Sequence, residues 1–174
     1  EKIYYEIINE VRNYVNLPVA VKTGFYFSSL AQSVKKLSQT GIKGLVLFNR
    51  PYNTDIDIDT IGLGHGPIYS TAEEYTHTLR WISILSGHVS CDLCASTGVH
   101  DHKVFIKQLL AGATAVQIVS ALYKEGFDII PEILKGTSNW MKKHNFDTVD
   151  SFRGKLSKSN LENPAAIERV QFMK

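Results

Sequence analysis

Residues 95–121 alternate apolar runs with small-residue turns, a pattern that few folds accommodate. Residues 95–100 read Ala-Ser-Thr-Gly-Val-His, and the turn Leu-Ala-Gly-Ala at 110–113 precedes the apolar run 115–119. The order predicts strand, turn, helix, strand and turn, which is a parallel α/β unit. Neighbouring parallel strands end at one edge, where turn N–H groups form a natural site for phosphate. Gly98 and Gly112 also fit ordinary turns, and that alternative stays open.

The same alternation extends along the chain and predicts one α/β domain over residues 1–174. Strands that alternate with helices form a parallel sheet whose strands are buried on both faces. Both a doubly wound sheet and a barrel satisfy this pattern. The chain opens on a helix and without a starting methionine, so we expect it to be the carboxy-terminal portion of something larger. The predicted strands are 19–22, 44–48, 89–97 and 115–119, and the predicted helices are 3–15, 28–39, 73–85, 102–111 and 127–144.

Two further segments have less regular patterns. Residues 49–70 read as a long polar loop, in which Asp55, Asp57 and Asp59 alternate as in a solvated edge strand. Cys91 and Cys94 form a CxxC pair with no second pair to complete a zinc site. Because these thiols fall in a predicted buried strand, we expect them to pack in the core.

Composition narrows the class of partner. The chain has 174 residues and a net charge of +2, with 44% hydrophobic and 21% charged residues. Charges of both signs are interspersed, so nucleic acid and anionic membranes are not expected partners, and a small molecule is. No His-rich motif has metal-ligand spacing, and we expect no metal. No apolar run is long enough for a membrane span and the first residues lack a signal peptide's apolar centre, which favours a cytoplasmic setting.

Polar residues at the predicted strand ends are the candidate functional groups. Lys22 directly follows an apolar run, where its ammonium group would face an anionic or electron-rich ligand or form a Schiff base, unless it simply extends into solvent. Asn49 offers both a donor and an acceptor to a planar heterocycle, or caps the turn before Pro51. His100 follows the predicted phosphate turn and either lies beside the cap of the next helix or touches the ligand.

Several short motifs follow one another along the chain. They are residues 18–22 (PVAVK), 44–50 (GLVLFNR), 55–57 (DID), 79–82 (LRWI), 96–100 (STGVH), 110–113 (LAGA) and 164–169 (PAAIER). Taken in order, these motifs resemble the dihydroorotate dehydrogenase-like flavoproteins. The resemblance covers essentially the whole chain and implies strands five to eight, the carboxy-terminal half, of a (β/α)8 TIM barrel.

The resemblance implies an FMN cofactor and a pyrimidine substrate, with hydride passing between dihydroorotate and the flavin. It places no catalytic base in this chain, because the family's loop cysteine or serine would lie before Glu1. Thr97 stands where the family often has glycine, and Val119-Ser120 stands where Gly-Thr is commoner. The implied cofactor-binding residues are Lys22 against the flavin ring, Ser70, Thr97 and Gly98 at the phosphate, and Val119 and Ser120, with Asn49 as the substrate-binding residue.

These inferences lead to one function and two alternatives. The first is the FMN- and substrate-binding portion of a dihydroorotate dehydrogenase-like oxidoreductase, inactive as this chain alone and completed by the missing amino-terminal half or by a second copy. The alternatives are a lyase or aldolase that uses Lys22 as a Schiff base on a phosphorylated substrate, and a non-catalytic half-barrel scaffold. We also expect a homo-oligomer, and we expect a side chain at Gly98 to occupy space meant for phosphate.

Overall fold

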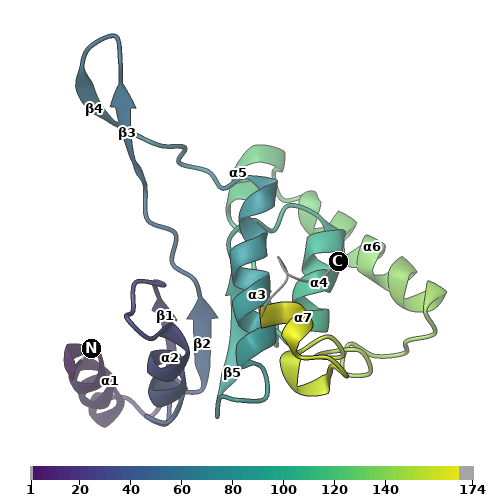
Figure 1. Ribbon diagram of the computed structural model, residues 1–174. Coiled ribbons are helices and arrows are strands. Elements are labelled where there is room, and N and C mark those ends of the chain that lie inside the picture. The colour runs from purple at the N-terminus through teal and green to yellow at the C-terminus, as the bar shows by residue number, and fades with distance from the viewer. Residues whose placement is uncertain (1, 169–174) are drawn as a thin grey trace.

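A four-stranded parallel sheet organises the chain, and the computed structural model describes residues 2–168 (Figure 1). Strands β1 (Ala20–Thr23), β2 (Gly44–Leu47), β5 (Asp92–Ser96) and β6 (Ala115–Gln117) lie side by side in that order. A doubly wound sheet reverses its strand order at a switch point, whereas a barrel adds each new strand beside the previous one. The sequential order observed is the one that a barrel uses.

Helices follow the strands as the sequence predicts, although several boundaries shift. Helix α4 begins and ends where it was predicted. Strand β5 begins three residues later than predicted, because Asp92 is its first residue that pairs with β2. Arg169, the last residue of the quoted motif 164–169, lies outside the described residues. The helices are α1 (Lys2–Tyr14), α2 (Leu30–Ser38), η1 (Ala72–Glu74), α3 (Tyr75–Leu85), α4 (His102–Ala111), α5 (Ser120–Glu125), α6 (Ile129–Lys143), η2 (Lys158–Asn160) and α7 (Ala165–Glu168).

The core lies between the sheet and its helices, on one face of the sheet only. Leu45, Leu47 and Leu93 point into this core and are almost completely buried, together with Val34 and Leu37 of α2. Side chains alternate between faces along a strand, so the intervening residues point to the other face. That face is largely open, with Ala20, Lys22, Asp92, Ala115 and Gln117 exposed. The prediction of strands buried on both faces is therefore confirmed for the central strand β2, where Val46 is buried on this second face, but it is wrong for the edge strands β1 and β6.

Residues 49–70 contain a β-hairpin, where the sequence indicated a polar loop. Strands β3 (Thr54–Asp57) and β4 (Gly62–His65) pair antiparallel and project away from the body (Figure 1). The turn is held by the Asp57 carboxylate, which accepts hydrogen bonds from the Asp59 and Thr60 N–H groups. The bond from Thr60 is the main reason that the pKa of Asp57 is lowered. The exposed strand expected around Asp55 and Asp57 is confirmed, but its partner is local.

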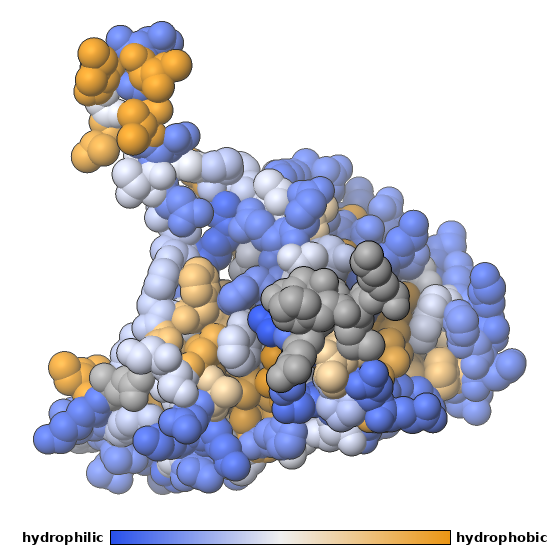
Figure 2. Space-filling view, in the orientation of Figure 1, coloured by the Kyte–Doolittle hydropathy of each residue, from blue (hydrophilic) through white to orange (hydrophobic). Residues whose placement is uncertain are grey.

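The hairpin carries apolar side chains into solvent. Ile56 and Leu63 are cross-strand partners and share one face of the hairpin, while Ile58 and Ile61 lie in its turn. All four are more than half exposed. Figure 2 shows an apolar patch at the tip of this projection. An isolated two-stranded hairpin is marginally stable in water. The hydrogen bonds that the Asp57 carboxylate accepts in the turn therefore help to stabilise this hairpin.

The two cysteines differ in how they pack. Both are free, half-buried thiols, and Cys91 packs against the main core cluster. Burial raises the pKa of Cys91 to about 11, with the Asp92 carboxylate adding to the effect, and burial also raises the pKa of Cys94. Both thiols therefore stay protonated near neutral pH. The expected core packing is confirmed for Cys91 but not for Cys94, which lies on the open face of the sheet in register with Val46. Within residues 2–168, no helix combines the length and apolar character that crossing a bilayer requires.

Candidate functional site

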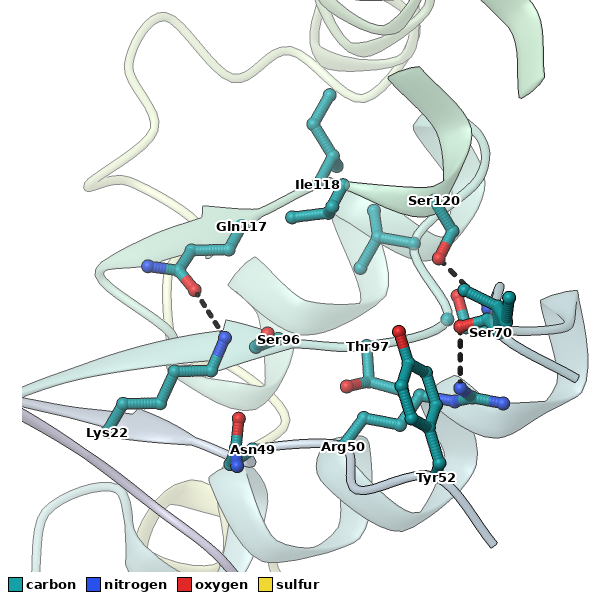
Figure 3. Close-up of a pocket in the computed structure, with 14 residues that line it drawn as sticks. Lys22, Asn49, Arg50, Tyr52, Ser70, Ser96, Thr97, Gln117, Ile118 and Ser120 are labelled. Carbon is teal, nitrogen blue, oxygen red and sulfur yellow. Dashed lines mark hydrogen bonds between the residues drawn. The ribbon is translucent and has the colours of Figure 1, made fainter. Parts of the chain in front are cut away.

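A pocket of about 220 Å³ opens at the carboxyl ends of the four parallel strands (Figure 3). Parallel α/β proteins place their ligand sites at this edge, because the loops that follow the strands converge there. The structure brings together the seven residues that the sequence assigned to cofactor or substrate binding, whereas His100, the other candidate, does not line this pocket. Lys22, Asn49, Ser70, Thr97, Gly98, Val119 and Ser120 all line this one pocket.

Lys22 reaches the pocket from the open face of β1. In the sheet register it pairs with Val46, whose own partner on β5 is Cys94, so its side chain shares a face with both. The Lys22 ammonium donates a hydrogen bond to Gln117 Oε1 at 3.3 Å, across the width of the sheet. Because the Gln117 amide is neutral, this contact orients the ammonium without cancelling its charge. Gln117 was not identified from the sequence, since no local pattern distinguishes it from other strand residues.

The turn after β5 has an unusual backbone. Thr97 has a φ of 86° and Gly98 a φ of 74°, both in the left-handed region. This region disfavours residues with a β-branched side chain, so Thr97 is strained. The Thr97 hydroxyl donates to the Phe48 carbonyl at 3.4 Å, which ties the turn to the end of β2.

Gly98 is required for a reason different from the one predicted. A Cβ at this position would lie 2.2 Å from the backbone nitrogen of Tyr75 and 2.8 Å from the Glu74 carbonyl carbon. Glycine therefore lets the turn pack directly against the start of α3. The expectation that a side chain would occupy phosphate space is wrong, because the Cβ vector points at this helix. Gly112 has a φ of 113° and caps α4, which makes it the ordinary turn residue that the alternative interpretation described.

Ser70 joins three segments of the pocket wall. Its N–H donates to Ser120 Oγ at 2.9 Å, and its carbonyl accepts a hydrogen bond from Lys124 Nζ at 3.1 Å. Its hydroxyl lies 3.1 Å from His100 Nε2. Ser70 is only 4% exposed, and it is thereby bound to residues that follow β5 and β6. His100 thus contacts a pocket residue directly, although the neighbouring Asp101 is the side chain that caps α4.

Arg50 fixes the other end of the same segment. Its guanidinium donates to Glu74 Oε2 at 2.6 Å and Oε1 at 3.2 Å, and also to the Ile68 carbonyl at 2.9 Å. Burial alone would raise the pKa of Glu74, but the hydrogen bonds from Arg50 and from the Thr71 N–H outweigh it, so the net pKa is lowered. Residues 68–74 are therefore fastened to the end of β2 on one side and to the β5 and β6 turns on the other.

The pocket has two polar ends. In Figure 3, Lys22, Gln117 and Asn49 lie toward one side, and Ser70 and Ser120 lie toward the other. The first end offers a cation and an amide that both donates and accepts. The second offers hydroxyl groups and the left-handed turn at Thr97. This arrangement suits an elongated ligand with a planar polar ring at one end and an anionic group at the other.

An aromatic cluster lies next to this pocket and was not anticipated from the sequence. Phe25, Phe48 and His77 contact one another with ring centroids between 5.0 and 6.0 Å apart. They line a second cavity that shares Asn49, Arg50 and Thr97 with the first. Burial, and then the charge of Arg80, lowers the pKa of His77, so its ring packs as a neutral group.

Among the described residues, no group of three His, Cys, Asp or Glu side chains could hold a metal ion.

The fold and pocket define a parallel α/β protein with a polar pocket at the carboxyl ends of its strands. No protein-family model matches the chain. The catalytic subunit of dihydroorotate dehydrogenase B (NAD⁺) from Saccharolobus solfataricus is 31% identical over 144 residues, or 80% of this chain and 49% of that protein. The corresponding subunit from Pyrococcus abyssi is 26% identical over 86% of this chain and 51% of that protein. The putative dihydroorotate dehydrogenase A (fumarate) from Aeropyrum pernix is 25% identical over 85% of this chain and 49% of that protein.

These matches identify the chain as a relative of the dihydroorotate dehydrogenases, which confirms the resemblance drawn from its motifs. The chain spans about half the length of the curated relatives it matches. Those relatives are dehydrogenases by name.

Proposed function

We propose that this chain forms the FMN- and substrate-binding half, strands five to eight, of a dihydroorotate dehydrogenase-like (β/α)8 barrel. The observation that carries the proposal is the convergence of all seven expected residues on one pocket, at the strand edge where barrels bind ligands. The sequential strand order supports a barrel segment, and so does the open face of the sheet opposite the core, which would face the interior of a barrel. The kinship with dihydroorotate dehydrogenases supports the reaction class.

The residues present fit the two ends of FMN. Its phosphate would lie at the Ser70 and Ser120 end, where Ser120 Oγ accepts the Ser70 N–H and keeps its own proton for an anion. Its ring would lie toward Lys22, whose contact with a neutral amide leaves a positive charge in the pocket. When bound, FMN would supply a ring that accepts hydride from the substrate.

The chain's own groups would position the reactants and stabilise charge. The Lys22 ammonium would favour negative charge that develops on a neighbouring ring, an effect that is strongest when the cation is held in place beforehand. The Asn49 amide would orient a planar pyrimidine through one donor and one acceptor. In this proposal the general base comes from residues outside this chain, and the complete barrel acts in the cytoplasm.

The first test is whether a preparation containing the complete barrel retains flavin and oxidises dihydroorotate. A protein with flavin absorbance and this activity is the expected result. Trapping of Lys22 by borohydride with a phosphorylated carbonyl compound would instead favour a lyase. A complete barrel that binds no flavin would favour a scaffold role.

Lys22 itself gives a sharper test within the same protein. We expect Lys22→Ala to leave the fold intact and to slow flavin reduction at least tenfold, because about 1.4 kcal/mol of charge stabilisation corresponds to a factor of ten in rate. Lys43→Ala is the matched control, because Lys43 precedes β2 at the opposite edge of the sheet and lines no part of this pocket. Stopped-flow reduction kinetics measure the effect, and equal rates in the two variants would remove Lys22 from the mechanism.

A further inference from the structure

The contact between Ser70 and His100 controls which polar atom the pocket wall offers to a ligand. A hydroxyl carries one proton and can accept two hydrogen bonds. When His100 Nε2 carries a proton, it donates to Ser70 Oγ across their 3.1 Å separation, and the Ser70 proton is free for another acceptor. When Nε2 carries none, Ser70 donates to His100 and presents only lone pairs elsewhere. A cationic imidazole has a proton on both nitrogens, so it permits only the first arrangement.

Charged side chains of both signs surround His100. Glu73 and Glu74 of η1 both interact electrostatically with His100. The pKa of Glu73 is lowered first by hydrogen bonds from the Thr71 hydroxyl and its own N–H, and further by the charge of His100. Glu74 is shared with Arg50, and Lys124 approaches from α5 to the Ser70 carbonyl. The adjacent Asp101 directs its carboxylate to the Val104 N–H instead.

We propose that His100 is a positioning residue that turns the Ser70 hydroxyl into a donor for a phosphoryl group, so that ligand binding and protonation of His100 favour each other. Ser70 and Ser120 would then both donate to the anion from adjacent points of the pocket wall. This inference rests on the proposed function, because it assigns the anion to the phosphate of FMN. The pairing of Ser70 with His100 could not be predicted from local patterns, because the two residues are separated by 30 positions.

The consequence is a specific pH dependence of FMN affinity. Histidine is the side chain whose charge commonly changes near neutral pH. A cationic His100 enforces the donor arrangement of Ser70, whereas a neutral His100 leaves it optional. FMN affinity in the wild type is therefore expected to fall about fivefold more between pH 6 and pH 8 than in His100→Gln, as the loss of one charge-assisted hydrogen bond predicts. The amide of Gln can still donate to Ser70 but does not titrate. The phosphate of FMN titrates identically in both proteins and cancels in this comparison.

The experiment measures dissociation constants by flavin fluorescence quenching from about pH 5.5 to about pH 8.5, in the complete barrel. The proteins are the wild type, His100→Gln, Ser70→Ala and the control His88→Gln, whose histidine is exposed and outside the pocket. Riboflavin, which has the same ring without the phosphate, is the second probe. We expect the extra pH dependence for FMN in the wild type and His88→Gln, and for neither probe in His100→Gln or Ser70→Ala.

The possible outcomes separate the inference from the proposed function. Equal pH dependence of FMN binding in the wild type and His100→Gln would overturn the role of His100 alone. The same extra dependence for riboflavin would also overturn it, because the effect would then belong to the ring. Absence of FMN binding in all four proteins would overturn the proposed function and this inference together.

Discussion

Thr97 is the residue whose local conformation most clearly departs from what its side chain prefers. Its left-handed φ of 86° carries a cost of order 1–2 kcal/mol for an L-residue with a Cβ, and its one polar contact is a long bond of 3.4 Å. Strained residues persist where the surrounding structure fixes them, and here the neighbouring Gly98 is locked against Tyr75. The strain therefore follows from the packing of the turn on α3.

This strain predicts the outcome of two substitutions at Thr97. Thr97→Gly should be more stable than Thr97→Ala by about 1 kcal/mol, because both remove the hydroxyl but only glycine adopts a positive φ without cost. Urea unfolding of the two variants measures the difference. If Thr97→Ala were the more stable of the two, the turn would not have the left-handed conformation described here.

Sequence reasoning located the residues of the site better than the contacts among them. Lys22, Asn49, Thr97 and Ser120 were identifiable because each follows an apolar run, and the ends of parallel strands converge. The partners of these residues were not identifiable. The bond from Ser70 to Ser120 joins residues 50 positions apart, and the bond from Lys22 to Gln117 joins residues 95 apart. Such pairings depend on the register of the folded sheet, which no local pattern contains.

Among the elements, the segment that includes η1 is held mainly by polar contacts. Its residues 68–74 are exposed or partly buried apart from Ser70, and the bidentate pair of Arg50 and Glu74 fixes it to the end of β2. The same hydrogen bonds lower the pKa of Glu74 despite its partial burial. A carboxylate whose folded-state pKa is lowered stabilises the fold above its unfolded-state pKa, and this contribution is lost as the pH falls through the folded-state value.

The pair therefore predicts an acid-dependent contribution to stability. Between neutral pH and about pH 3, the free energy of unfolding of the wild type should fall more than that of Glu74→Gln, which should already be destabilised by about 2 kcal/mol at neutral pH. Glu125→Gln, at the exposed end of α5, is the control and should retain the wild-type pH dependence. Urea unfolding at several pH values provides the measurement. Parallel stability curves for the wild type and Glu74→Gln would contradict this role.

The β3–β4 hairpin shows how an element can be misread from its pattern alone. Alternating aspartate and isoleucine residues indicated a solvated strand, and β3 is that strand. The apolar side chains Ile56 of β3 and Leu63 of β4 are nevertheless more than half exposed. Glycines at 62 and 64 hid the second strand, because glycine is depleted in strands. The hairpin forms because its own turn pairs the two strands, independently of the main sheet.

At the scale of the whole molecule, much of the surface is of a kind that proteins usually cover. Strands β1 and β6 lie at the two edges of the described sheet, and the face of the sheet opposite the core is largely open. Ile3, Ile7 and Val11 form a stripe on α1 and are 67%, 54% and 42% exposed. Open strand edges and continuous apolar surfaces promote pairing with another chain.

We therefore expect the 174-residue chain studied alone to self-associate and to bind FMN far more weakly than the complete barrel does. Two copies of a four-stranded unit have the strand count of a full barrel, but α1 and the β3–β4 hairpin are not shaped for that contact. The wall opposite Lys22 would then be absent or irregular, and the ring of FMN would have only part of its contacts. Analytical ultracentrifugation over a range of concentrations, with and without added FMN, measures both properties. A monodisperse monomer that binds FMN tightly would contradict the half-barrel proposal itself.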